Sequence, residues 1–275
     1  MRLTFYGVRG STPSFHSTNH RYGGNTASIV LEESDEDPIL FDLGTGLRPY
    51  GATCPTDGSY RATALVTHIH WDHVQGLPFF APLHVPGARL EVYAPHQDEG
   101  TLHDVLAELV RPPYFPVRCD DLAGKFGFHD VTADTFVVGS RKVTARPVPH
   151  NGPTVGYRVE SAQASVAYIS DHQAPLTLDS VAEGVLELAD GVDALIHDSQ
   201  YTPDEFFQKS TWGHCTTEYA LLVAQQAGAK RLVMFHHDPG HTDEDIDRLC
   251  SELAQKAKGT GVEVTAAFEG MVLDL

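Results

Sequence analysis

Residues 61–73 read RATALVTHIHWDH. The first part, Arg61 to Thr67, is largely apolar and predicts a β-strand. Candidate metal ligands then follow within six residues, namely His68, His70, Asp72 and His73. Open α/β sheets commonly bind their ligands beyond the carboxyl ends of strands, so we expect a metal site at this strand exit.

The spacing of these side chains predicts two neighbouring ions. His68 and His70 alternate along an extended segment and therefore lie on one side of it, whereas Asp72 and His73 turn toward an adjacent position. Imidazole and carboxylate are ligands of Zn²⁺ and similar divalent ions, and the same set accepts Mn²⁺ or Fe²⁺. We therefore expect two divalent metal ions as cofactors, with Zn²⁺ as the first candidate.

A two-metal site needs further ligands, and three later strands end in a suitable side chain. His150 ends the strand in RPVPH, Asp171 follows AYIS, and His236 follows RLVMF. Asp171 is the candidate bridge because a carboxylate offers two oxygens. His172 and His237 adjoin these residues and compete for the same roles, but we prefer the residue nearer the strand end.

The rest of the chain alternates between strands and helices. Further strands are expected at 2–8, 27–32, 39–42, 90–93, 136–138, 142–148, 155–160, 165–169, 194–197, 231–235, 262–265 and 271–275, and helices at 99–110, 176–188, 217–227 and 242–256. Two β-rich blocks flanked by helices predict an α/β fold with two mixed sheets face to face and helices outside. No linker divides the chain, so we expect one domain over residues 1–275. Residues 112–130 are a candidate lid.

The amino-acid composition argues against several classes of protein. The chain has 275 residues, 41% of them apolar, and lacks an apolar stretch of the length that a membrane span needs, so we expect a cytoplasmic protein without membrane contact. The 4 cysteines are scattered, which argues against disulfides and thiolate ligands. A net charge of −18 disfavours a long nucleic acid as partner and favours a small-molecule substrate. A homodimer is left open.

The chain resembles the metallo-β-lactamase superfamily over nearly its whole length. The HxHxDH signature of that family matches His68, His70, Asp72 and His73, and its later ligands match His150, Asp171 and His236. The resemblance implies an αββα four-layer sandwich. It also implies one ion held by His68, His70 and His150, the other by Asp72, His73 and His236, and Asp171 as the bridge. Asp42, in FDLGTG, would orient a ligand rather than bind metal.

Two further segments are similar to the RNase Z and phosphodiesterase branch of this superfamily. Residues 212–216, WGHCT, resemble its GHST element, and residues 196–199, IHDS, resemble its His-Glu-Ala segment with Asp198 in place of glutamate. By this resemblance His214 would donate a proton to the leaving group and Asp198 would orient it. The alternative is that Thr216 or Thr217 only caps the following helix.

We therefore expect a two-metal hydrolase with Asp72, His214 and Asp198 as catalytic residues. It would act on a small phosphodiester, such as a cyclic nucleotide, by attack of a metal-bridging hydroxide. The alternatives are an RNase Z-like endoribonuclease and a thioester or lactone hydrolase of the glyoxalase II or lactonase type. A non-catalytic binding protein is a third class, but such proteins usually lose metal ligands.

Substrate contacts are harder to predict from the sequence. Arg9, Arg48, Tyr157 and Tyr201 lie near the motif loops, although a packing or surface role is the commoner one for such residues. We interpret three aromatic residues as packing rather than base-stacking residues, namely Trp71, Phe79 and Phe80.

Overall fold

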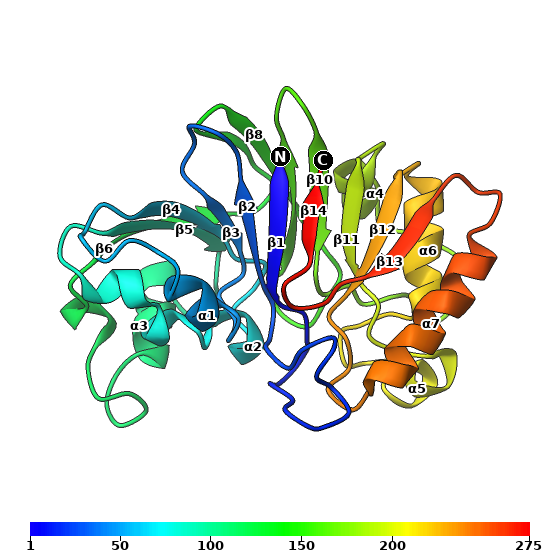
Figure 1. Ribbon diagram of the computed structural model, residues 1–275, viewed down its shortest axis with the longest axis horizontal. Coiled ribbons are helices and arrows are strands. Elements are labelled where there is room, and N and C mark those ends of the chain that lie inside the picture. Colours follow the sequence, from blue (N-terminus) through cyan, green and yellow to red (C-terminus); the bar gives the residue numbers. More distant parts are fainter.

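Two seven-stranded sheets face each other in the computed structural model, which describes residues 1–275 (Figure 1). The first sheet consists of β1 (Arg2–Gly7), β2 (Ser28–Glu32), β3 (Ile39–Phe41), β4 (Arg61–Leu65), β5 (Arg89–Pro95), β6 (Lys125–Val131) and β14 (Val272–Asp274). The second consists of β7 (Thr135–Val138), β8 (Arg141–Pro147), β9 (Val155–Glu160), β10 (Ser165–Ile169), β11 (Ala194–Asp198), β12 (Arg231–Phe235) and β13 (Glu263–Ala266). Their orders are β14-β1-β2-β3-β4-β5-β6 and β13-β12-β11-β10-β9-β8-β7. That these residues form one domain stays a prediction.

Helices cover the outer faces of the two sheets (Figure 1). Those of the first half are α1 (Leu47–Gly51), α2 (Trp71–Val74) and α3 (Leu102–Leu109), with 3-10 turns at Leu77–Phe79, Ala81–His84 and Cys119–Asp121. Those of the second half are α4 (Glu183–Ala189), α5 (Pro203–Gln208), α6 (Thr217–Gln226) and α7 (Asp243–Lys256). None of these helices is both long and apolar enough to pass through a membrane.

Three apolar clusters fill the spaces between the layers. One packs α1 and α3 against the first sheet, one lies between the sheets, where Phe5 meets Phe235, and one packs α4, α6 and α7 against the second sheet. Central strands such as β11 are buried along their whole length because a sheet covers one face and helices cover the other. The four-layer αββα sandwich expected from the sequence is confirmed.

Strands β4, β11 and β12 are parallel to both neighbours, whereas β10 is parallel to β11 and antiparallel to β9. In the first sheet β3, β4, β5 and β6 are parallel, and in the second sheet β10, β11, β12 and β13 are parallel. Because parallel strands end at the same edge of a sheet, the segments that follow β4, β10, β11 and β12 are brought close together. This edge faces downward in Figure 1, where α2 lies.

The structure differs from the sequence-based elements in several places. Strand β6 occupies residues 125–131 and pairs with β5, so the last part of the candidate lid 112–130 is an edge strand. Phe126 and Phe128 alternate with more polar neighbours there, which is the strand signal that the proline-rich residues before it obscured. Helix α5 was not expected. Helix α4 begins only at Glu183, because Leu178 adopts a left-handed backbone conformation and Ala182 is still extended, and a helix excludes both.

Candidate metal centre

The segment from His68 to His73 turns from a strand into a short helix. His68 follows β4, His70 precedes α2 with extended backbone, and Asp72 and His73 occupy the first turn of α2. The change from extended to helical backbone sends the first two imidazoles and the last two side chains in different directions. The division into two pairs expected from the spacing is therefore present in the structure.

His68, His70 and His150 form the first cluster of ring nitrogens. His68 Nε2 lies 2.8 Å from His70 Nδ1, and His150 Nε2 lies 3.2 Å from the same atom. Nitrogens on a common Zn²⁺ ion at tetrahedral angles are about 3.3 Å apart. His68 is buried and His70 is exposed, so the cluster is reachable from solvent.

Asp72, His73 and His236 form the second cluster. Asp72 Oδ2 lies 3.2 Å from His73 Nε2 and 3.2 Å from His236 Nε2. His73 Nε2 is buried without a hydrogen-bond partner, which is costly for a polar atom unless another group binds there. His236 directly follows β12 with a φ of 59°, a left-handed conformation rare outside glycine, and this turn accompanies its entry into the cluster.

Asp171 lies between the two clusters and divides its oxygens between them. Its Oδ2 lies 3.8 Å from His68 Nε2 and 3.7 Å from His150 Nε2. Its Oδ1 lies 3.2 Å from His73 Nε2 and 3.4 Å from His236 Nε2. A carboxylate placed in this way suits a bridge between two cations.

The electrostatics of the clusters favour cation binding. Burial holds the pKa of His68 well below its usual value, so this imidazole is neutral and offers a lone pair. Burial opposes ionisation of Asp171, but the imidazoles of His236 and His73 hold its pKa well below the usual range. Burial likewise opposes a charge on His73, yet the carboxylates of Asp72, Asp171 and Asp42 raise its pKa well above normal. Buried carboxylates are stable only beside positive charge. The imidazole nitrogens and carboxylate oxygens of these clusters are ligands that divalent metal ions accept.

Outer contacts orient the imidazoles. His73 Nδ1 donates to Asp42 Oδ2 at 2.8 Å, and His150 Nδ1 donates to the carbonyl of Gly213 at 2.7 Å. Asp42 itself is held by the hydroxyl of Tyr168 at 2.7 Å and the backbone N–H of Thr67 at 2.7 Å. With their outer nitrogens engaged as donors, these imidazoles direct Nε2 inward, where binding of a cation would displace a proton. Asp42 thus occupies the orienting position that the resemblance implied.

Two orienting contacts were missed in the sequence. Gln200 Oε1 accepts a hydrogen bond from His236 Nδ1 at 2.8 Å, and the backbone N–H of Ser11 donates to Asp72 Oδ2 at 2.7 Å. Gln200 lies two residues after β11, so its place after a strand of the parallel set was the only available signal. The contact of Ser11 is made by its backbone N–H group, so the type of residue at this position could not predict it.

His214 and Asp198 form a hydrogen-bonded pair beside the clusters. His214 Nδ1 donates to Asp198 Oδ2 at 2.9 Å, and the imidazoles of His214 and His236 have ring centroids 5.0 Å apart. Asp198 is fixed by the backbone N–H groups of His172 and Gln200, each at 3.0 Å. Burial disfavours the imidazolium form of His214, but the carboxylate of Asp198 raises its pKa above the usual value.

Residues 214–216 have two roles in the structure, one in helix capping and one beside the metal clusters. Thr216 is the N-cap of α6 and accepts from the N–H of Tyr219, so the capping role is present together with the His214–Asp198 pair. His214 also lies close enough to Asp171 and His236 to share an ion with them. Because His214 Nδ1 donates a hydrogen bond to Asp198, this atom is not free to bind a metal ion, and Asp198 orients the ring.

The alternative ligands His172 and His237 do not lie in either cluster. His237 Nε2 donates to the carbonyl of Ala267 at 2.9 Å, and His172 Nδ1 lies 3.0 Å from His197 Nε2, away from both clusters. The structure thus brings His236 and Asp171, rather than these neighbours, into the centre.

The candidate substrate contacts are mostly packing residues. Arg9 is buried and donates to the carbonyls of Gly23, Asp238 and His241. The hydroxyl of Tyr157 donates to the carbonyl of Val66. Tyr201 is buried against His214, with ring centroids 5.6 Å apart. Arg48 lies apart from the clusters and faces a groove.

Trp71 and Phe79 are not core residues, although Phe79 packs edge to face on Phe115. Their exposed fractions are 68% and 56%, whereas Phe80 is fully buried as expected. Trp71 begins α2, and the helical turn that directs Asp72 and His73 inward leaves this indole on the solvent side.

Gln200 provides a test of the outer contacts. Gln200→Leu removes the acceptor for His236 Nδ1, and loss of such a contact weakens metal affinity about 10- to 100-fold. We expect this loss in a competition titration with a chromophoric chelator, whereas Gln200→Glu should retain most of the affinity. The matched control is Gln163→Leu on the exposed surface. Equal affinity of the wild type and Gln200→Leu would contradict the orienting role.

Comparisons with known proteins agree with this geometry. The sequence model of the beta-lactamase superfamily domain matches residues 39–237. Ribonuclease Z of Haloarcula marismortui is 26% identical to the chain over 318 residues, covering 98% of this chain and 96% of that protein.

Solved structures show the same fold. The metallo-beta-lactamase fold protein YhfI of Bacillus subtilis superposes with a TM-score of 0.74 at 18% identity, covering 99% of this chain and 98% of YhfI. The short form of human tRNase Z gives a TM-score of 0.70 at 21% identity, covering 100% of this chain and 99% of that one. Because the family match covers more than half of the residues, the chain belongs to the beta-lactamase superfamily, as a metal-dependent hydrolase with the metallo-β-lactamase fold.

Proposed function

We propose that the chain is a phosphodiesterase that binds two divalent ions, with Zn²⁺ as the first candidate and Mn²⁺ or Fe²⁺ as alternatives. One ion would be held by His68, His70 and His150, the other by Asp72, His73 and His236, and Asp171 would contact both. The position of Asp171, with one oxygen toward each cluster, is the observation that supports this proposal most strongly. Bound ions of this kind supply Lewis acidity, which polarises phosphoryl oxygens and makes water a stronger nucleophile at neutral pH.

The protein residues would contribute orientation and proton transfer. Asp198 accepts from His214 Nδ1 and so directs His214 Nε2 as the atom that donates a proton. When the bond between phosphorus and the leaving oxygen breaks, that oxygen takes the proton from Nε2 and departs as an alcohol. Asp42 and Gln200 would hold His73 and His236 in place during this step.

His214→Ala tests the proposed proton donor. A general acid contributes about 10²- to 10⁴-fold to the rate, so kcat on an unactivated dinucleotide should fall by that factor. The loss on bis-p-nitrophenyl phosphate should be much smaller, because nitrophenolate leaves without a proton. The control is His96→Ala on the exposed surface.

Metal content must be measured on the same samples. We expect His214→Ala to retain the full metal complement of the wild type. Loss of an ion would instead assign His214 as a ligand, and undiminished turnover of the dinucleotide would exclude it as the acid.

Two substrate classes are candidates, and different observations favour them. The relative from Haloarcula is named Ribonuclease Z, and the human structure is a tRNase Z. These names favour RNA, and we take an RNase Z-like cleavage as the first candidate, ahead of the cyclic nucleotide that the sequence alone put first.

A small phosphodiester is the second candidate. The net charge of −18 opposes binding of a polyanion. The alignment with the Haloarcula protein runs over 318 positions, more than the 275 residues of this chain, so that relative carries segments without a counterpart here. The chain would thus have less surface with which to hold a large RNA.

A parallel substrate screen separates these candidates. The metal-loaded protein is given a precursor tRNA, cyclic mononucleotides and a thioester, with His68→Ala as the inactive control. We expect cleavage of the precursor tRNA. Turnover of cyclic nucleotides alone would replace the first candidate by the second, and turnover of the thioester alone would overturn the proposal of a phosphodiesterase.

A further inference from the structure

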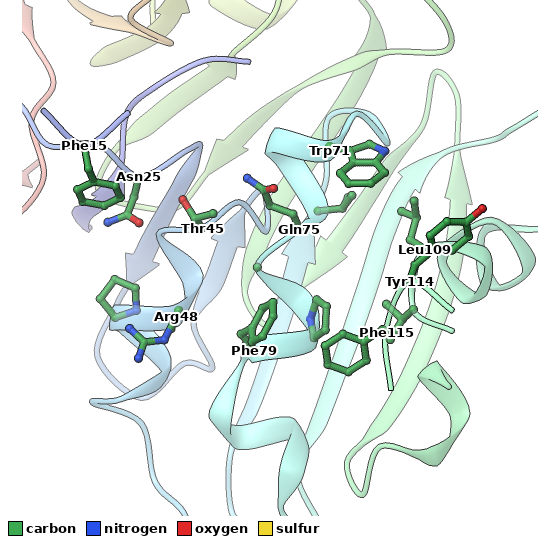
Figure 2. A pocket seen from close by; sticks show the side chains of 15 residues that line it. Phe15, Asn25, Thr45, Arg48, Trp71, Gln75, Phe79, Leu109, Tyr114 and Phe115 are labelled. Carbon is green, nitrogen blue, oxygen red and sulfur yellow. The ribbon is translucent and has the colours of Figure 1, made fainter. Parts of the chain in front are cut away.

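Exposed aromatic side chains line a groove to which α2 contributes Trp71 and the position after α2 contributes Gln75 (Figure 2). It has a volume of about 580 Å³, within the range of small-molecule sites. We call it the aromatic groove, and its defining residues are Phe15, Arg48, Trp71, Phe79, Tyr114 and Phe115. They come from the loop before β2, from α1, from α2 and the turn after it, and from the segment that follows α3.

The rings of this groove are unusually open to solvent. The exposed fraction is 75% for Phe15, 68% for Trp71, 56% for Phe79 and 71% for Tyr114. A single exposed ring is ordinary, but several around one hollow are typical of a binding site. Phe79 and Phe115 meet edge to face with centroids 5.6 Å apart, so the wall is partly built before any ligand binds.

The aromatic groove adjoins the metal centre through residues that neighbour the metal ligands in the chain, although none of the ligands lines it. Trp71 lies between His70 and Asp72 in the chain, and Gln75 follows in the turn after them. On the other side, Phe15 lies on the loop whose Ser11 N–H donates to Asp72 Oδ2. The two segments that border the centre, around Trp71 and around Ser11, thus also carry residues of the groove.

The charge of the lining selects among the possible attached groups. Arg48 is the only charged residue among those that line the groove, which holds no carboxylate although the chain is strongly acidic. The side chains of Arg48 and Gln75 make no hydrogen bond or ion pair within the protein, and Figure 2 shows them among the rings. Flat rings with free polar groups suit a heteroaromatic base, whereas an extended polyanion would need several cations.

We propose that the aromatic groove binds the base of a nucleotide whose phosphodiester lies at the metal centre. This inference rests on the proposed phosphodiesterase function and deepens it, because it assigns recognition of a base to residues outside the metal centre. The base stacks on Trp71 and Phe79, and Arg48 and Gln75 meet its polar edge. Stacking on aromatic side chains tolerates every base, so the groove selects for a base without fixing its identity.

Two esters with the same leaving group test this proposal. One is the p-nitrophenyl ester of thymidine 5′-monophosphate, and the other is the p-nitrophenyl ester of 1,2-dideoxyribose 5-phosphate, which has the same sugar but no base. In each, water adds to phosphorus, the bond to the nitrophenyl oxygen breaks, and p-nitrophenol is released, so only the base differs. We expect a higher kcat/KM for the nucleotide ester.

Variants assign that preference to the groove. Trp71→Ala and Phe79→Ala should each lower the ratio of the two kcat/KM values by about tenfold, the usual scale of one base–ring contact. Trp71→Phe keeps a ring and should retain most of the ratio. Phe207→Ala is the matched control, because Phe207 is 66% exposed but does not line the groove. An unchanged ratio in Trp71→Ala and Phe79→Ala would overturn the proposal.

Fluorescence gives a readout that does not need turnover. The chain has only 2 tryptophans, so Trp212→Phe leaves Trp71 as the single indole. Thymidine 5′-monophosphate should quench its fluorescence in a saturable way, and ribose 5-phosphate, which lacks a base, should not. Absence of quenching by the nucleotide, or equal quenching by both, would contradict stacking on Trp71.

Failure of the two proposals can be told apart. If the metal-loaded protein hydrolyses neither ester, the phosphodiesterase function fails, while the fluorescence titration still decides whether the groove binds a base. If both esters are hydrolysed with equal kcat/KM, the function stands and the base-binding groove is excluded.

Discussion

The carboxylate of Asp171, buried between two sets of imidazoles, is the constraint on which the centre depends. Each of its oxygens faces a different cluster, so its negative charge is shared between them. An ionised carboxylate in the interior is expensive unless cations or donors surround it. The parallel ends of β4, β10 and β12 bring those partners together from distant parts of the sequence. The two-sheet architecture and the chemistry of the site are therefore linked through one side chain.

Residues outside the two clusters hold the metal ligands and His214 in position. Asp42 and Gln200 fix imidazoles from outside, and Asp198 fixes His214 at the rim. Farther out, α2 has two sides with opposite roles, since it directs Asp72 and His73 inward and Trp71 outward. A helix of four residues thereby connects metal chemistry with the surface that would recognise the substrate.

The sequence predicted much of this because the information was local. HIHWDH is one short segment, and His150, Asp171 and His236 each end or follow an apolar strand, so residue type and strand position were sufficient. Gln200 could not be predicted, since its contact with His236 spans 36 residues and depends on how β11 and β12 pair. The outward direction of Trp71 was missed because so short a helix leaves no periodic pattern to read. Strand β6 was missed because the prolines before it suggested a loop.

The central claim is that this chain places two ions on either side of Asp171. Crystals grown with Zn²⁺ and measured at the zinc absorption edge test it most directly. The account predicts two anomalous peaks per chain, one beside His68, His70 and His150 and the other beside Asp72, His73 and His236. A single peak, or peaks away from these side chains, would contradict it.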